Sequence, residues 1–189
     1  AKTYSWPCEE KYGMVMVWFH PERIEPLYPC ISIPELDEGK KFTQRGSYLY
    51  EDVKMHLQEF AENSADMQHF SPLHGTLCIP WTGPRSRVRA INVPFVKIIH
   101  EAGFALAEEP YIANFFNTAY LSVFGKKLSS AVKAHITFYG PGGITLFRFD
   151  GDFGRIYLFH THTPDSFTNL DVQFMVYAES RIPRLLVWY

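Results

Sequence analysis

The 189 residues combine 47% hydrophobic with 20% charged side chains and carry a formal net charge of −2. This balance is typical of one well-cored globular domain and excludes a disordered chain. Because 18 basic residues stand against 20 acidic ones without a basic block, we expect no nucleic-acid partner. Aromatic residues make up 16% of the chain, which favours a cavity for an apolar ligand.

The three cysteines are too few and too widely spaced for a disulfide framework. Cys8, Cys30 and Cys78 therefore indicate a reduced, intracellular protein in which they mostly fill the core. No apolar run reaches 18 residues, so no membrane span is expected. The chain begins without a signal-like stretch and ends on apolar residues, and we expect both ends to continue in a longer protein.

The first half of the chain predicts a strand, a connector and a helix. Residues 12–20 favour a strand buried on both faces. Four prolines between residues 21 and 34 favour an extended linker. Over residues 51–69, apolar side chains recur at helical spacing, so we expect one helix that Pro72 and Gly75 end or kink.

The second half is predicted to be mostly strand. We expect two short strands within residues 86–107, separated at Pro94. Residues 111–124 fit either a helix or an aromatic loop. Short turns then join four strands into an antiparallel meander over 131–139, 144–150, 153–163 and 170–178. One helix with two groups of strands predicts an α+β domain.

A group of polar residues near the end of the predicted helix carries the chemistry. Asn63, Asp66 and His69 follow at steps of three along one helix face, and His74 comes five residues later. We expect a bend at Pro72 to turn His74 back towards His69. Two imidazoles and a carboxylate form the facial triad of non-heme iron oxygenases, and Asp66 is placed to accept the second ring N–H of His69.

The pattern Asn63-x2-Asp66-x2-His69-x4-His74 resembles the mononuclear-iron motif of Rieske-type non-heme iron oxygenases. The string HLQEFAENSADMQHFSPLHG is most similar to cholesterol 7-desaturases of the Neverland type and to 3-ketosteroid 9α-hydroxylases. The opening KTYSWPCEEKYGMVMVWF resembles the end of a Rieske domain, and AVKAHITFYGPGGITLFRFDGDFGRIYLFHTHTP resembles the catalytic sheet. The resemblance divides the chain into a Rieske tail with a Pro-rich linker (1–45) and a C-terminally truncated catalytic domain (46–189).

The resemblance implies a helix-grip fold of the Bet v 1/START-like kind, with an antiparallel sheet around a long helix and a sterol-sized pocket. His69 and His74 would bind mononuclear Fe(II), and Asp66 would bridge His69 to a cluster-binding histidine of a neighbouring subunit. Asn63 would support the iron site. The implied function is that of a cholesterol 7-desaturase using O2. The alternatives are a 3-ketosteroid 9α-hydroxylase-like monooxygenase and a non-catalytic sterol- or lipid-binding module.

The resemblance also implies parts that these residues lack. No cysteine has a histidine two or three residues later, so the [2Fe–2S] Rieske cluster is expected in the full-length protein outside this chain. The third, carboxylate ligand of the iron is expected beyond Tyr189. A sterol substrate, an NAD(P)H-dependent reductase or ferredoxin, and a homotrimer are the implied partners. Association with the endoplasmic reticulum would come from further segments.

A second pair of histidines, His160 and His162, lies on one face of a predicted strand. Such a pair is typical of cupin metal sites, although no further ligands are evident nearby. A pocket wall or a solvent-facing strand is the other interpretation. The alternating arginines 85, 87 and 89 are expected on a solvated face.

Overall fold

The computed structural model describes residues 3–39, 41–79, 91–184 and 187. The chain forms two compact units, 1–42 and 43–189. The division lies close to the expected boundary at residue 45, while the assignment of the first unit to a Rieske domain stays a prediction. Among the described helices, none is long and apolar enough to cross a membrane.

The first unit contains a hairpin and a short helix. Strands β1 (Cys8–Lys11) and β2 (Met14–Val17) pair antiparallel, and the two turn residues between them, Tyr12 and Gly13, both have positive φ as a tight hairpin turn requires. The single strand expected over 12–20 is therefore wrong, and Val15 and Val17 are exposed. The Pro-rich connector ends in helix α1 (Pro34–Asp37), because proline is tolerated in the first helical turn.

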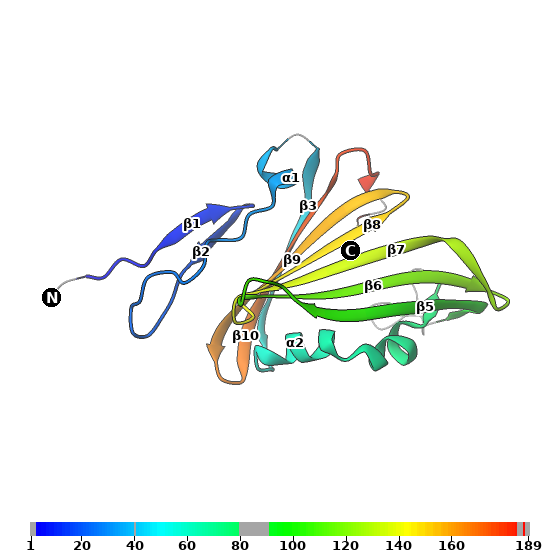
Figure 1. The fold of residues 1–189 in the computed structure, drawn as a ribbon, viewed down its shortest axis with the longest axis horizontal. Coiled ribbons are helices and arrows are strands. Elements are labelled where there is room, and N and C mark those ends of the chain that lie inside the picture. Colours follow the sequence, from blue (N-terminus) through cyan, green and yellow to red (C-terminus); the bar gives the residue numbers. More distant parts are fainter. Residues whose placement is uncertain (1–2, 40, 80–90, 185–186, 188–189) are drawn as a thin grey trace. The chain divides into compact units, whose positions relative to one another are not determined.

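The second unit is an eight-stranded antiparallel sheet with one main helix (Figure 1). The strand order is β3-β10-β9-β8-β7-β6-β5-β4, so consecutive strands from β4 to β10 pair with each other and β3 joins β10 at the far edge. The α+β helix-grip expectation is confirmed. The strand bounds are β3 (Phe42–Val53), β4 (Thr76–Cys78), β5 (Asn92–Leu106), β6 (Ile112–Val123), β7 (Lys126–Tyr139), β8 (Ile144–Gly151), β9 (Gly154–Ser166) and β10 (Asn169–Glu179).

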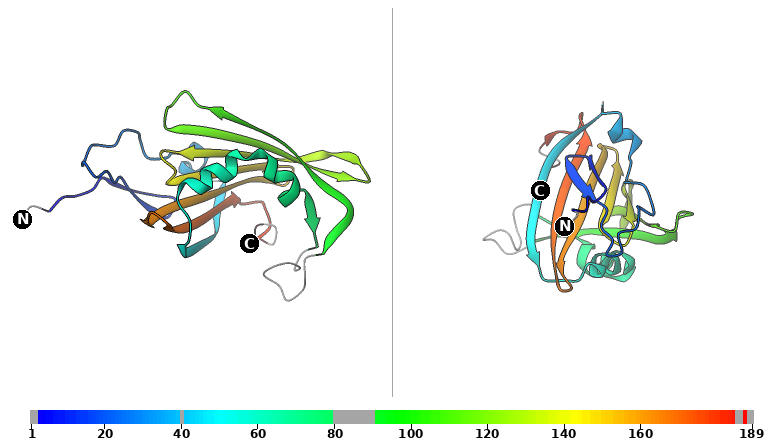
Figure 2. Two further views of the ribbon diagram at one scale, coloured as in Figure 1. Left: turned by 90° about the horizontal axis from the view of Figure 1, so that it is seen from below. Right: turned by 90° about the vertical axis from the view of Figure 1, so that its left-hand side faces the viewer.

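Helix α2 (Gln58–Ala65) lies along one face of this sheet (Figure 2). The expected start at residue 51 is wrong, because Glu51 and Asp52 belong to strand β3. Phe60 of α2 stacks on His162 of β9 with ring centroids 4.1 Å apart. The helix-facing side of the sheet also contains a cluster of Phe115, Ile136 and Phe138, packed against Ala61 and Phe70.

The four-stranded meander was predicted correctly as β7 to β10, and the two preceding strands were not. Strand β5 runs through Pro94 without a break, and the next residue, Phe95, has a positive φ of 61°. Strand β6 replaces the helix or loop expected over 111–124, since it pairs with both β5 and β7. Its side chains alternate, so Phe115 is fully buried and Phe116 is 45% exposed.

Two smaller expectations also differ from the structure. Strand β9 continues past its expected end at residue 163 and runs to Ser166. All three cysteines are free, and Cys8 and Cys78 are exposed, so the expected role in the core does not apply to them. The arginines at 85, 87 and 89 lie outside the described residues.

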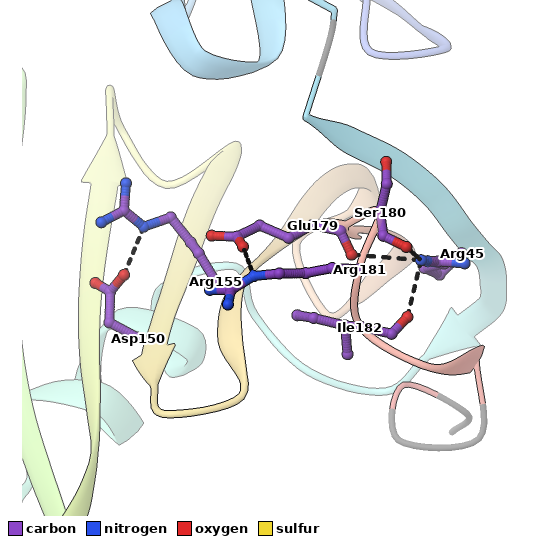
Figure 3. Close-up of polar contacts among 7 residues, drawn as sticks. All are labelled: Arg45, Asp150, Arg155, Glu179, Ser180, Arg181 and Ile182. Carbon is purple, nitrogen blue, oxygen red and sulfur yellow. Dashed lines mark hydrogen bonds and ion pairs between the residues drawn. The ribbon is translucent and has the colours of Figure 1, made fainter.

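The chain leaving β10 is attached to strand β3 through Arg45 (Figure 3). The guanidinium Nη2 donates to the backbone carbonyls of Glu179, Ser180 and Ile182 at 3.4, 3.2 and 3.0 Å. Ile182 is 1% exposed and packs with Val176, Ala178 and Val187. One arginine thus fixes the turn at the end of the last strand.

Candidate functional site

The polar motif lies on three consecutive helical segments of different kinds. Helix α2 ends at Ala65, and Asp66 leaves the helix with extended backbone angles (φ −76°, ψ 91°). Its Oδ1 accepts the Gln68 backbone N–H at 2.9 Å, which caps a 3₁₀ turn (Met67–His69). A π turn (Phe70–His74) follows directly. The expectation of one regular helix to about Phe70 is therefore wrong.

The π turn explains how a five-residue spacing brings two histidines together. In an α-helix, residues five apart point in different directions, roughly 140° apart around the axis. A π turn is wider and stacks residue i near residue i+5. Pro72 lies inside this turn and does not act as a simple bend. His69 and His74 accordingly lie with ring centroids 5.4 Å apart and planes at 73°.

The tautomer of His69 is fixed by the backbone of Asp66. His69 Nδ1 lies 2.5 Å from the carbonyl oxygen of Asp66, which can only accept, so Nδ1 carries the proton. The Asp66 carboxylate lies 3.9 Å from the same nitrogen, which is too long for a hydrogen bond. Asp66 is therefore the partner of His69 as predicted, but it accepts the hydrogen bond through its backbone carbonyl and not through its side chain. His69 Nε2 keeps its lone pair for a metal.

The backbone of His74 is held by His100, a residue that the sequence patterns did not indicate. His100 Nε2 lies 3.2 Å from the His74 carbonyl oxygen and therefore donates to it. The other ring nitrogen, Nδ1, accepts from the Asn117 side-chain amide at 3.1 Å. Burial, followed by the neighbouring His69 and His100, lowers the pKa of His74. The neutral imidazole that results is the form that binds metals.

Phe70 joins this turn to the core of the sheet. Its ring stacks on Phe115 with centroids 5.5 Å apart and lies 5.1 Å from the ring of His100. Phe115 is fully buried in the helix-facing cluster. Phe70, which lies between His69 and His74 in the sequence, therefore anchors both predicted ligands to the core. Only a correct assignment of 92–106 and 112–123 to strands could have pointed to His100, Asn117 and Phe115.

In the described part of the chain, the structure brings neither Asn63 nor a third metal ligand to the two histidines. Asn63 lies exposed in the last turn of α2, and no contact described for the chain joins it to either histidine. Within the described residues, no group of three or more His, Cys, Asp or Glu side chains is arranged to hold a metal. The carboxylate of Asp150 is paired with Arg148 and Arg155.

His160 and His162 share the helix-facing side of β9. Their ring centroids are 6.3 Å apart with perpendicular planes. His162 is 4% exposed and donates from Nδ1 to the Gly142 carbonyl at 2.8 Å. Burial lowers the pKa of both rings, that of His160 to about 3. The solvent-facing interpretation is wrong. A cupin-like site finds no third ligand among the described residues.

Comparisons with known proteins agree with the motif. The sequence profile of the 3-ketosteroid 9α-hydroxylase C-terminal domain matches residues 17–184. The chain is 31% identical over its whole length to cholesterol 7-desaturase nvd 1 of Ciona intestinalis, covering 39% of that protein. It is 25% identical over 99% of its length to cholesterol 7-desaturase of Caenorhabditis elegans, covering 44% of it.

A shorter match links the chain to a bacterial enzyme. Over 77 residues, 39% of this chain and 20% of the relative, it is 31% identical to the 3-ketosteroid-9-alpha-monooxygenase oxygenase component of Rhodococcus rhodochrous. The chain spans about two fifths of the length of the two desaturases that it matches from end to end. The chain therefore belongs to the 3-ketosteroid 9α-hydroxylase C-terminal domain family, among the Rieske oxygenase catalytic domains that its motif indicated.

Proposed function

We propose that this chain is the catalytic domain of a Rieske-type sterol 7-desaturase and that His69 and His74 bind its mononuclear Fe(II). The geometry of the two histidines carries the proposal. Two imidazoles that occupy adjacent positions on one metal have ring centroids roughly 5 Å apart, and these lie 5.4 Å apart. The desaturase names of the two relatives matched over almost the whole chain favour this chemistry.

The donor set fits ferrous iron of the two-histidine, one-carboxylate class. Nε2 is the nitrogen of His69 left for the metal, because Nδ1 donates to the Asp66 carbonyl, and the lowered pKa of His74 favours the neutral, metal-binding form of that ring. We place the third ligand beyond Tyr189. When bound, the iron would supply the oxygen activation needed to oxidise an unactivated C–H bond, with electrons from a [2Fe–2S] cluster in another part of the full-length protein.

The side chain of Asp66 supports a route for those electrons. It is 58% exposed, whereas the ring of His69 is 11% exposed. Asp66 is therefore placed to contact a cluster-binding histidine of a neighbouring subunit while its backbone holds His69. In this proposal the full-length protein is a homotrimer that receives electrons from an NAD(P)H-dependent reductase or ferredoxin, and Asn63 supports the iron site from α2.

The helix-facing side of the sheet is the proposed sterol surface. It is formed largely by apolar side chains, among them Phe115, Ile136, Phe138 and Phe147. Rigid aromatic and aliphatic side chains are suited to the flat, apolar ring system of a sterol. This surface adjoins the histidine pair through Phe70, which contacts both His74 and Phe115.

The direct test uses the full-length protein reconstituted with ferrous iron and a reductase. We expect His69→Ala and His74→Ala each to lower the iron content about tenfold or more and to abolish sterol turnover. His56→Ala, which changes a histidine just before α2, serves as the matched control and should retain both. Undiminished turnover in His69→Ala would refute the assignment.

The product separates the remaining alternatives. Loss of two hydrogens from the sterol identifies desaturation, and gain of one oxygen identifies the hydroxylation named for the Rhodococcus relative. Tight sterol binding by a full-length protein that takes up no iron would instead identify a non-catalytic binding module.

A further inference from the structure

The buried histidine pair on β9 is the feature that the proposed iron site does not use. His160 and His162 alternate with Thr161, so both rings lie on the helix-facing side of the sheet. Their neighbours are aromatic: Phe60 stacks on His162, while Phe147 and Phe174 lie 4.4 and 4.2 Å from His160 between ring centroids. Two polar rings therefore lie among the aromatic side chains of Phe60, Phe147 and Phe174, which together we call the apolar wall.

Each ring buries a nitrogen that has no partner. In the part of the chain that the structure describes, Nε2 of His160 and Nε2 of His162 are both shielded from solvent and lack a hydrogen bond. An unpaired buried acceptor is unfavourable by about 1–3 kcal/mol in proteins. Such atoms in a wall of apolar side chains indicate a site whose partner arrives with a ligand.

The hydrogen bond that Nδ1 of His162 makes determines which kind of group can pair with Nε2 of the same ring. Nδ1 faces the Gly142 carbonyl at 2.8 Å, and a carbonyl only accepts, so the ring proton is on Nδ1. Nε2 is then an acceptor, and burial keeps the ring neutral by lowering its pKa. The stacked Phe60 ring covers a face of the imidazole, whereas the Nε2 lone pair lies in the ring plane. A hydroxyl group can satisfy this nitrogen, and a ketone oxygen cannot.

We propose that Nε2 of His162 accepts a hydrogen bond from a hydroxyl group of the steroid substrate and so selects steroid alcohols over steroid ketones. The inference rests on the proposed function, because it takes the ligand of this wall to be a steroid. His160 is the second polar contact for the same hydroxyl group. This assigns substrate recognition to β9, on a different element from the proposed iron ligands.

The test compares cholestanol with cholestanone, which share one skeleton and differ in a hydroxyl or a ketone at one carbon. Dissociation constants are measured on the iron-loaded full-length protein without reductase, so that binding is read without turnover. We expect the wild type to bind the alcohol about tenfold more tightly. His162→Phe should lose that preference by weakening alcohol binding alone. His135→Phe is the matched control, since this ring bonds Asn114 and stacks on Phe116 away from the wall.

The outcomes separate this inference from the proposed function. Equal binding of both steroids by the wild type, or an unchanged preference in His162→Phe, would overturn the inference even if turnover depends on His69. In that case the unpaired nitrogens bind water alone. Binding of neither steroid would overturn the inference together with the sterol proposal. Should His162→Phe unfold, His162→Leu removes the acceptor with a smaller apolar side chain; the inference requires a reduced alcohol preference there too.

Discussion

Replacing His160 by leucine should remove a large part of the acid sensitivity of this chain. The folded-state pKa of His160 is about 3, because burial and the nearby His162 disfavour its charged form, while an unfolded histidine titrates near 6.5. Above pH 6.5 the ring is neutral in both states. As the pH falls from 6.5 towards 3, only the unfolded chain gains the proton, so stability is lost over that range.

At pH 4.5 the unfolded chain is favoured by about 3 kcal/mol through this one group, since each pH unit contributes about 1.4 kcal/mol. The free energy of unfolding is measured with urea at pH 7.0 and at pH 4.5. It should be lower at pH 4.5 in both proteins, but the decrease should be about 3 kcal/mol smaller in His160→Leu than in the wild type. Thr161→Val, whose side chain points to the opposite face of β9, should decrease like the wild type. Equal decreases in His160→Leu and the wild type would refute the burial argument.

Three further substitutions test the packing of the sheet. Phe115→Ala should lower the free energy of unfolding by about 3–5 kcal/mol because the ring is fully buried, and Phe116→Ala, next in sequence and 45% exposed, by less than half of that in the same urea titration. Gly154→Ala should cost about 1–3 kcal/mol, because φ is +125° and a Cβ would lie 3.1 Å from Ile182 Cδ1; Gly103→Ala, with open space around its Cα, should cost little. Arg45→Met removes the guanidinium bonds to three carbonyls of the turn that the Ile182 N–H closes onto Glu179, so hydrogen exchange at the Ile182 amide should become faster; an unchanged rate would contradict the role of Arg45 in holding that turn.

The elements that sequence patterns predicted well are those whose ends carry local turn signals. Gly140 and Gly142 have positive φ, as tight turns demand, so the end of β7 and the start of β8 follow from the chain itself. Strand β6 is also followed by a glycine with positive φ, Gly125, but that turn marks its end and not its type. Its identity comes from pairing with β5 and β7, and its aromatic side chains fit helical and strand spacing equally well.

The closeness of His69 and His74 could be predicted from the sequence, whereas the residues that hold them in place could not. The spacing from Asp66 to His74 indicated a metal pair, whereas the 3₁₀ and π turns that bring the rings together depend on the packing of Phe70. His100 is 26 residues away in sequence and acts on the backbone of His74. A partner of this kind becomes visible only when the strand register is known.

The backbone contacts of the π turn also bear on how a metal would be acquired. Phe70 is inserted into the core, and the His74 carbonyl is bonded to His100, so the two imidazoles are held by folding alone. Zinc fingers are the opposite case, in which the metal organises the chain and chelators unfold it. Here a chelator should strip the ion and leave the sheet and helix in place, and the empty domain should reload without refolding.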